Sequence, residues 1–194
     1  GDIAKFAEHL RKGLPSRSYK PTDGKVRFLY SKITDDQLMN ADQIICAFNK
    51  TRTEYNNRVR NIYGHKNTVE IGERVMCLKN NIKNGLFNGM QGKVINLYVG
   101  KYGKKYMDFE FDDIVIKDIW YDDSCFGQEK YKFRHGSDTP NPFDYAYCIT
   151  AHKSQGDEFA KVFVNEQKCK NWEHKRWAYT AASRPKEDLL WKIG

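Results

Sequence analysis

Apolar positions change their spacing along the chain, and each change marks a boundary between two kinds of secondary structure. Near the start, Ile3, Phe6 and Leu10 recur at helical spacing, and Gly13 follows as a stop signal. Further on, residues 43–48 form a continuous apolar run, which predicts a buried parallel strand. A buried strand followed by a polar turn and a helix is typical of an open α/β sheet.

Two short patterns predict where helices begin in this first part. Thr34 and Gln37 form a capping box, and Thr51 and Glu54 form a second one just after the run at 43–48. In such a box the threonine side chain accepts a hydrogen bond from the third helical N–H group. We therefore expect a brief helix after Thr34 and a longer one after Thr51, with a short strand at 26–30 ahead of both.

Helical spacing disappears between about residue 72 and residue 143. Short alternating strands are predicted there, at 74–78, 93–98, 106–111 and 114–120. Glycine and asparagine separate them, which favours a small antiparallel barrel or sandwich. After Pro140 and Pro142 the α/β pattern resumes, with strands at 146–150, 161–165 and 189–193 and a helix around 172–183. The chain is therefore predicted to be an α/β domain, 1–71 and 144–194, with an inserted β domain, 72–143.

Composition narrows the class of protein. The formal net charge is +8, from 33 Lys+Arg against 25 Asp+Glu, which favours polyanionic partners such as nucleic acids. No apolar run approaches the ~18–20 residues of a membrane span, so no membrane partner is expected. The start lacks the pattern of a signal peptide. Five cysteines without a Cys-x-x-Cys pair suit a reducing compartment, and the five histidines show no zinc spacing. We predict a cytoplasmic protein with no metal site among its own residues.

Two segments carry the strongest chemical signal. Residues 147–159 read YCITAHKSQGDEF, an apolar run followed by a dense polar cluster, and residues 177–184 read WAYTAASR, a helical segment ending in one arginine. Polar loops at strand ends bind phosphates, and an isolated arginine suits the charge of a phosphoryl-transfer transition state. The two segments resemble motifs V and VI of superfamily 1 helicases. The resemblance is to the C-terminal, UvrD-like region of the RecD-like superfamily 1B branch, and it covers almost the whole chain.

The resemblance implies a fold and an activity. It implies a RecA-like lobe, the second of two, with an SH3-like β-barrel inserted in it. The whole protein would be an ATP-dependent 5′–3′ DNA helicase. No Gly-x-x-x-x-Gly-Lys-Ser/Thr loop occurs in the chain, and no strand ends in the Asp-Glu pair that holds magnesium. The chain is therefore expected to be a C-terminal fragment without activity alone. The N-terminal RecA-like lobe of the whole protein would supply most of the contacts to ATP and Mg²⁺.

Five residues are assigned to the nucleotide by this resemblance. Arg184 would be an arginine finger, and Gln155 would lie near the γ-phosphate. Gly156 would allow close backbone approach, Glu158 would contact the nucleotide sugar, and Arg52 is a further candidate near the nucleotide. From the residues alone, a solvated cation at a helix end is the favoured interpretation of Arg184. The resemblance of Tyr179-Thr-Ala-Ala-Ser to motif VI reverses this and favours the finger.

Six further residues are assigned to single-stranded DNA, the expected partner. They are Thr150, His152, Lys153 and Ser154 of the first segment, with Asn49 and Lys50, which resemble motif IV. Hydrogen bonds from such groups to backbone phosphates position a strand without reading its sequence. Asn49 and Lys50 also suit an ordinary turn between a strand and a helix.

The barrel segment adds a weaker signal. Its turns combine lysines with tyrosines, among them Lys101, Lys104, Lys105, Tyr98, Tyr102 and Tyr106. Such turns hold single strands in many proteins, but a solvated lysine-rich surface has the same composition. Trp120, Phe126 and Phe133 are predicted to lie in the barrel core.

Two other functions fit the same residues. One is a single-stranded nucleic-acid-binding module without ATP chemistry, for which a start codon near Gly1 in the parent gene would argue. The other is an RNA helicase of viral superfamily 1 type, which preferential stimulation by RNA would reveal.

Overall fold

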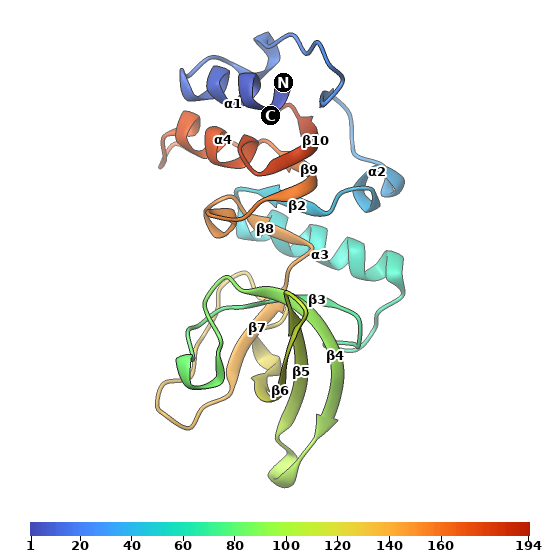
Figure 1. The fold of residues 1–194 in the computed structure, drawn as a ribbon, viewed down its shortest axis with the longest axis vertical. Helices are drawn as coiled ribbons and strands as arrows, with labels where there is room; N and C mark the ends of the chain where they lie inside the picture. Colours follow the sequence, from blue (N-terminus) through green and yellow to red (C-terminus); the bar gives the residue numbers. More distant parts are fainter. The chain divides into compact units, whose positions relative to one another are not determined.

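The computed structural model describes all 194 residues and divides the chain into two compact units. One unit joins Gly1–Tyr55 to Cys148–Gly194, and the other is Asn56–Tyr147. The second unit is wider than the predicted insertion at 72–143, because the C-terminal half of the helix α3 (Asn49–Tyr63) groups with the barrel. Figure 1 traces the chain through both units.

The first unit is built on a five-stranded sheet in which every pairing is parallel. The strands are, in spatial order, β1 (Val26–Leu29), β10 (Pro185–Lys192), β9 (Phe159–Asn165), β2 (Gln43–Cys46) and β8 (Cys148–Thr150). Its other helices are α1 (Asp2–Arg11), α2 (Asp35–Met39) and α4 (His174–Ala182). Ile44 of β2 is in register with Cys148 of β8. This confirms that the apolar runs at 43–48 and 146–150 share one sheet.

Helix α1 packs beside α4 and closes one side of this unit (Figure 1). Its apolar stripe is buried, as the helical spacing predicts. Phe6 is fully buried, and its ring meets Trp191 of β10 edge-on at a centroid distance of 5.1 Å. The helix predicted from the first residues is therefore part of the core of the sheet. No helix of the structure combines the length and the apolar character that a bilayer span requires.

The second unit is a closed barrel of five strands. They are β3 (Arg74–Cys77), β4 (Gln91–Val99), β5 (Lys105–Phe111), β6 (Ile114–Asp122) and β7 (Asn141–Tyr145). The pairings are antiparallel except for β6 with β7. Met107, Phe109 and Phe143 are fully buried inside it. The predicted small barrel is confirmed.

The fifth strand, β7, is the element that the sequence pattern missed. Pro142 lies inside it, and proline normally argues against a paired strand because it has no N–H group. Here the carbonyl of Pro142 accepts a hydrogen bond from the N–H of Leu78 at 3.0 Å. The pairing with β3 therefore continues past a residue that cannot donate. The strand predicted at 146–150 correspondingly begins later, at Cys148.

The first of the two predicted capping boxes is confirmed. The side chain of Thr34 accepts a hydrogen bond from the N–H of Gln37 at 3.2 Å. The side chain of Gln37 accepts one from the N–H of Thr34 at 3.0 Å. Helix α2 begins at the next residue, as this motif requires.

The second capping box is wrong, because α3 begins at Asn49 rather than after Thr51. Its start is fixed by Gln167, which follows β9. The Gln167 Oε1 accepts hydrogen bonds from the N–H groups of Ala47 and Phe48, at 2.9 and 3.2 Å. Its Nε2 donates to the Thr51 hydroxyl at 2.7 Å. A side chain that lies beyond the end of β9, far away in the sequence, therefore fixes the start of the helix in place of a local cap.

Glu166, the residue after β9, is a buried carboxylate with four hydrogen-bond partners. Ser16, Trp191 and the backbone N–H of Gly194 donate to it at 2.7, 3.0 and 3.1 Å, and the His174 ring lies at 2.9 Å. Burial alone would raise its pKa, but these hydrogen bonds outweigh burial and hold the pKa below the ordinary value. A depressed pKa means that the folded state prefers the charged form.

Glu166→Gln should therefore lower stability and flatten its pH dependence. The stabilisation is present above the pKa of the unfolded chain and is lost as the pH falls through the folded pKa. We expect a loss of roughly 1–3 kcal/mol in the free energy of unfolding near pH 7, since an amide cannot accept four donors. Urea unfolding between about pH 7 and pH 3 measures both effects. Glu173→Gln, at an exposed carboxylate, is the control, and an unchanged acid dependence in Glu166→Gln would contradict the assignment.

A second buried charge lies in the barrel unit, where Glu73 is fully buried against Arg60 of α3. The two side chains form a bidentate pair, with Nε to Oε1 at 2.7 Å and Nη2 to Oε2 at 3.1 Å. The guanidinium also lies 4.3 Å from the centre of the Tyr145 ring. The pair ties the C-terminal half of α3 to the barrel within this unit.

Candidate functional site

Five of the predicted site residues gather at the edge of the sheet where β2 and β8 end. Asn49 and Lys50 follow β2, and His152 and Lys153 follow Thr150, the last residue of β8. The strands are parallel and adjacent, so their carboxyl ends meet at one edge, where open α/β sheets bind ligands. Asn49, Lys50 and His152 are exposed, whereas Thr150 and Lys153 are half-buried. This edge presents donors and positive charge to solvent.

Two predicted site residues lie inside the fold. Arg52 is 5 % exposed, and its Nε donates to Asn49 Oδ1 at 3.4 Å. Ser154 is fully buried, and its hydroxyl donates to the carbonyl of Ala151 at 2.6 Å. In this arrangement Arg52 supports the exposed Asn49, and Ser154 supports the exposed turn at His152.

The remaining four predicted residues meet where β9 and β10 begin. Gln155, Gly156 and Glu158 form the turn that leads into β9, and Arg184 comes directly before β10. Phe159 and Pro185 are in register, and the N–H of Phe159 donates to the Arg184 carbonyl at 2.9 Å. Segments far apart in the sequence are therefore held side by side.

Arg184 is the residue that links these two segments. Its Nη1 donates to the carbonyls of Ser154 and Asp157, at 3.2 and 3.0 Å. Its Nε donates to the carbonyl of Thr180, one turn back in α4, at 2.9 Å. Its Nη2 has no partner within the chain. Nη1 thus ties the guanidinium to the turn and Nε ties it to α4, while Nη2 can bind a ligand.

The turn itself is open to solvent. Gln155 and Glu158 are exposed, and Glu158 lies 3.8 Å from Lys186 in a weak surface ion pair. Gly156 has a φ of +86°, a conformation that favours glycine, and no atom lies within 4 Å of the position that a Cβ would take. Backbone and side chains here can approach an anion without a steric obstacle.

The pKa of one carboxyl group near the Arg184 guanidinium, that of Asp157, is shifted by burial. Asp157 is half-buried, and burial raises its pKa, although the charge of Arg184 acts in the opposite direction.

No group of three His, Cys, Asp or Glu side chains in the chain could hold a metal ion. The chemistry available at this turn is therefore anion binding by a fixed arginine, an open glycine backbone and an exposed amide.

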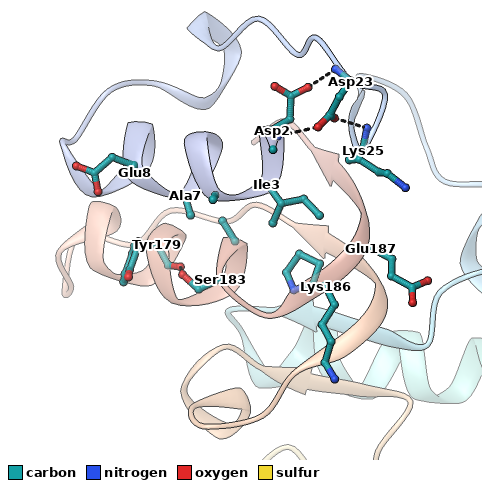
Figure 2. Close-up of a pocket in the computed structure, with 14 residues that line it drawn as sticks. Asp2, Ile3, Ala7, Glu8, Asp23, Lys25, Tyr179, Ser183, Lys186 and Glu187 are labelled. Atoms are coloured by element: carbon teal, nitrogen blue, oxygen red, sulfur yellow. Dashed lines mark hydrogen bonds between the residues drawn. The ribbon is translucent and has the colours of Figure 1, made fainter.

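A cavity of about 680 Å³ adjoins Arg184 and was not predicted from the sequence. Figure 2 shows it, with the start of α1 on one side and the end of α4 on the other. Ser183 and Pro185, the neighbours of Arg184, line it together with Tyr179 and Lys186. Only the small and polar residues around Arg184 could have indicated an opening here.

Two further residues of the site were also missed. Gln167 fixes the start of α3 beside Asn49 and Lys50, and Lys186 pairs with Glu158. Gln167 follows a parallel strand and Lys186 comes two positions after Arg184. Polar residues at strand ends were the available signal, but only the contacts between segments give these two a role.

A known protein family matches the part of the chain that contains these segments. Residues 145–190 match the family of UvrD-like helicase C-terminal domains. The matched residues run from the end of β7 into β10, so they include both the turn at Gln155–Glu158 and Arg184. The predicted resemblance to a helicase C-terminal region is confirmed.

Solved structures of Pif1 helicases are similar over nearly the whole chain. Bacteroides Pif1 bound to ssDNA has a TM-score of 0.60 and 17% identity, covering 97% of this chain and 48% of that one. Pif1 helicase from Candida albicans has a TM-score of 0.59 and 17% identity, with coverage of 100% and 53%. Bacteroides Pif1 in complex with ADP-AlF3 and ssDNA has a TM-score of 0.53 and 18% identity, with coverage of 96% and 44%. The chain spans about half the length of these proteins. The predicted fold class, a RecA-like parallel sheet with an inserted barrel, is confirmed.

Proposed function

We propose that this chain is the second lobe of an ATP-dependent DNA helicase or translocase of the RecD-like branch, moving 5′ to 3′ on single-stranded DNA. The observation that carries the proposal is the attachment of Arg184 to the carbonyls of Ser154 and Asp157. This attachment holds a permanent cation beside an open glycine turn and leaves one guanidinium nitrogen for a ligand. Fixed donors aimed at a phosphoryl group are the main catalytic device of such motors.

Nucleotide contacts are assigned to the turn before β9. Arg184 would contact the γ-phosphate through Nη2, Gln155 would lie beside it, and Glu158 would reach the sugar. The open backbone at Gly156 suits this role, because a Cβ-free position allows close approach. When bound, ATP supplies the phosphoryl group whose transfer drives movement.

The metal ion is assigned to residues outside this chain. No carboxylate cluster here fits Mg²⁺, which prefers oxygen ligands and the oxygens of bound phosphates. We propose that an N-terminal RecA-like lobe supplies those ligands and the phosphate loop. The isolated chain should then bind nucleic acid but turn over no ATP.

The DNA track is assigned to the opposite edge of the sheet, where β2 and β8 end. Asn49, Lys50 and His152 are exposed there, with Thr150 and Lys153 behind them. Amide, hydroxyl and ammonium groups of this kind bind backbone phosphates and do not distinguish bases. The net charge of +8 supports a polyanionic partner.

Binding of the chain to oligo-dT should be weak, independent of sequence and strongly dependent on salt. Removing one phosphate-binding cation should reduce the slope of log K against log[salt] by about 0.7. We expect this reduction in Lys50→Gln and no change in Lys20→Gln, an exposed lysine elsewhere in the same unit. Fluorescence anisotropy with oligo-dT, a mixed-sequence DNA and oligo-rU measures all three properties. Salt-insensitive binding would overturn the DNA track, and a clear preference for oligo-rU would favour an RNA helicase.

A further inference from the structure

The turn between β4 and β5 exposes an aromatic ring that the fold does not use. Tyr102 is 94 % exposed, so its ring lies almost wholly in solvent. Its φ is +61°, a strained left-handed conformation that is uncommon for residues other than glycine. Neither burial nor backbone preference explains a tyrosine here.

Beside the turn, three more aromatic rings form a row on the outside of the barrel. Tyr98, Tyr106 and Trp120 are cross-strand neighbours on β4, β5 and β6. The rings of Tyr98 and Tyr106 are stacked, with centroids 5.3 Å apart and an angle of 12° between the planes. Trp120 was predicted to lie in the core. It faces outward instead, because the next residue along its partner strand, Met107, takes the inward position.

The row is fixed in place by its neighbours. A Cβ on Gly100 would lie 2.6 Å from the Tyr106 ring, so this ring packs directly on the backbone of the turn. The Tyr98 hydroxyl donates to Asp118, and the Lys104 ammonium lies 4.0 Å from the centre of the Trp120 ring. Tyr98 is exposed in this row, whereas Tyr106 and Trp120 are half-buried, so the rings form a supported aromatic surface. Figure 1 shows the β4–β5 hairpin extending beyond the other strands of the barrel.

Charge is distributed unevenly over this unit. Lys101, Lys104 and Lys105 lie at the β4–β5 turn, and residues 97–107 include no acid. Lys105 is paired with Asp123 at 2.5 Å, which leaves Lys101 and Lys104 without a carboxylate partner. The next turn, between β5 and β6, instead contains Asp112 and Asp113. Positive charge is thus concentrated at the tip of the hairpin, around Tyr102, whereas the carboxylates of Asp108 and Asp118 lie near the Tyr98 hydroxyl.

We propose that the β4–β5 hairpin is a second contact for single-stranded nucleic acid, in which unpaired bases stack on Tyr102 and on the Tyr98–Tyr106 surface. Lys101 and Lys104 bind the phosphates on either side. Stacking on aromatic rings beside basic groups is independent of sequence, because every base has a π-face. A duplex hides those faces, so the contact selects unpaired strands. The inference rests on the proposed function for the kind of partner, but it concerns a different unit of the chain.

The test replaces the ring and retains the backbone conformation. Tyr102→Asn removes the ring, and asparagine tolerates a positive φ, so the turn is preserved. The affinity for an oligo-dT of about 20 nucleotides should fall roughly tenfold, whereas Tyr102→Phe should stay within about twofold. Lys101→Gln should weaken binding, and Lys117→Gln on β6 should not. An oligo-dT containing 5-iodouracil should cross-link, on irradiation, to Tyr102 or Tyr98.

The outcomes separate this inference from the proposed function. If Lys50→Gln weakens binding but Tyr102→Asn does not, and no cross-link maps to the hairpin, the hairpin contact is overturned and the sheet-edge track remains. If Tyr102→Asn weakens binding and Lys50→Gln does not, the hairpin contact stands and the track fails. If the unaltered chain binds no oligo-dT even at low salt, both are overturned.

Discussion

Arg184→Ala in the complete protein is expected to lower kcat by roughly 10³ and to leave ATP binding within a few-fold of the unaltered protein. The reason is that a finger arginine acts mainly on charge that develops in the transition state. Ground-state phosphate contacts would come largely from the other lobe. Steady-state hydrolysis and nucleotide titration of the same preparations measure the two quantities separately.

Two controls distinguish a catalytic effect from a structural one. Arg184 also donates to the carbonyls of Thr180, Ser154 and Asp157, so its loss can displace the turn before β9. Arg184→Lys should recover little activity, because an ammonium cannot bridge these carbonyls and present a further planar donor. Arg176→Ala removes an exposed arginine from α4, the helix that precedes Arg184, and should leave kcat unchanged. A near-normal kcat in Arg184→Ala would reduce the residue to a cation at a helix end.

The sequence predicted most elements because local patterns determine them. The apolar run at 43–48 became the buried strand β2, and the Thr34 capping box became the start of α2. Spacing of this kind is set by neighbours a few residues away. The predictions failed where a distant residue decides the outcome. Gln167 sets the start of α3, and the acceptor at Pro142 keeps β7 paired with β3.

In the candidate site, too, the sequence showed the local motifs but not what depends on distant residues. The two motif segments were visible in the sequence, and the fold joins one to the other through Arg184. The sequence could not show that Arg52 and Ser154 are buried, since both are polar and lie among exposed neighbours. It also could not show that Trp120 faces outward, because a tryptophan in an alternating strand suits either face. Burial and the direction of a side chain depend on the register between strands.

Glu73→Ala is expected to destabilise the barrel unit by about 3–5 kcal/mol, because it leaves the Arg60 guanidinium buried without its counter-charge. The Glu73 side chain is fully buried, and that of Arg60 is 11 % exposed. Glu73 also accepts hydrogen bonds from the N–H of Glu70 and the hydroxyl of Tyr147, at 2.8 and 3.2 Å. Its removal therefore leaves several donors without an acceptor.

The decisive comparison uses a pair with the same geometry but a different environment. Glu8 and Arg11 of α1 also form a bidentate pair, at 2.7 and 2.8 Å, but their side chains are 43 % and 60 % exposed. Glu8→Ala should leave the stability almost unchanged, because water screens the exposed charges. Urea unfolding, with hydrogen exchange of β3 to β7 to locate the effect, measures both variants. Arg60→Met combined with Glu73→Leu should recover much of the lost stability, since no buried charge then remains. Equal losses in Glu73→Ala and Glu8→Ala would mean that burial of the pair does not determine its contribution.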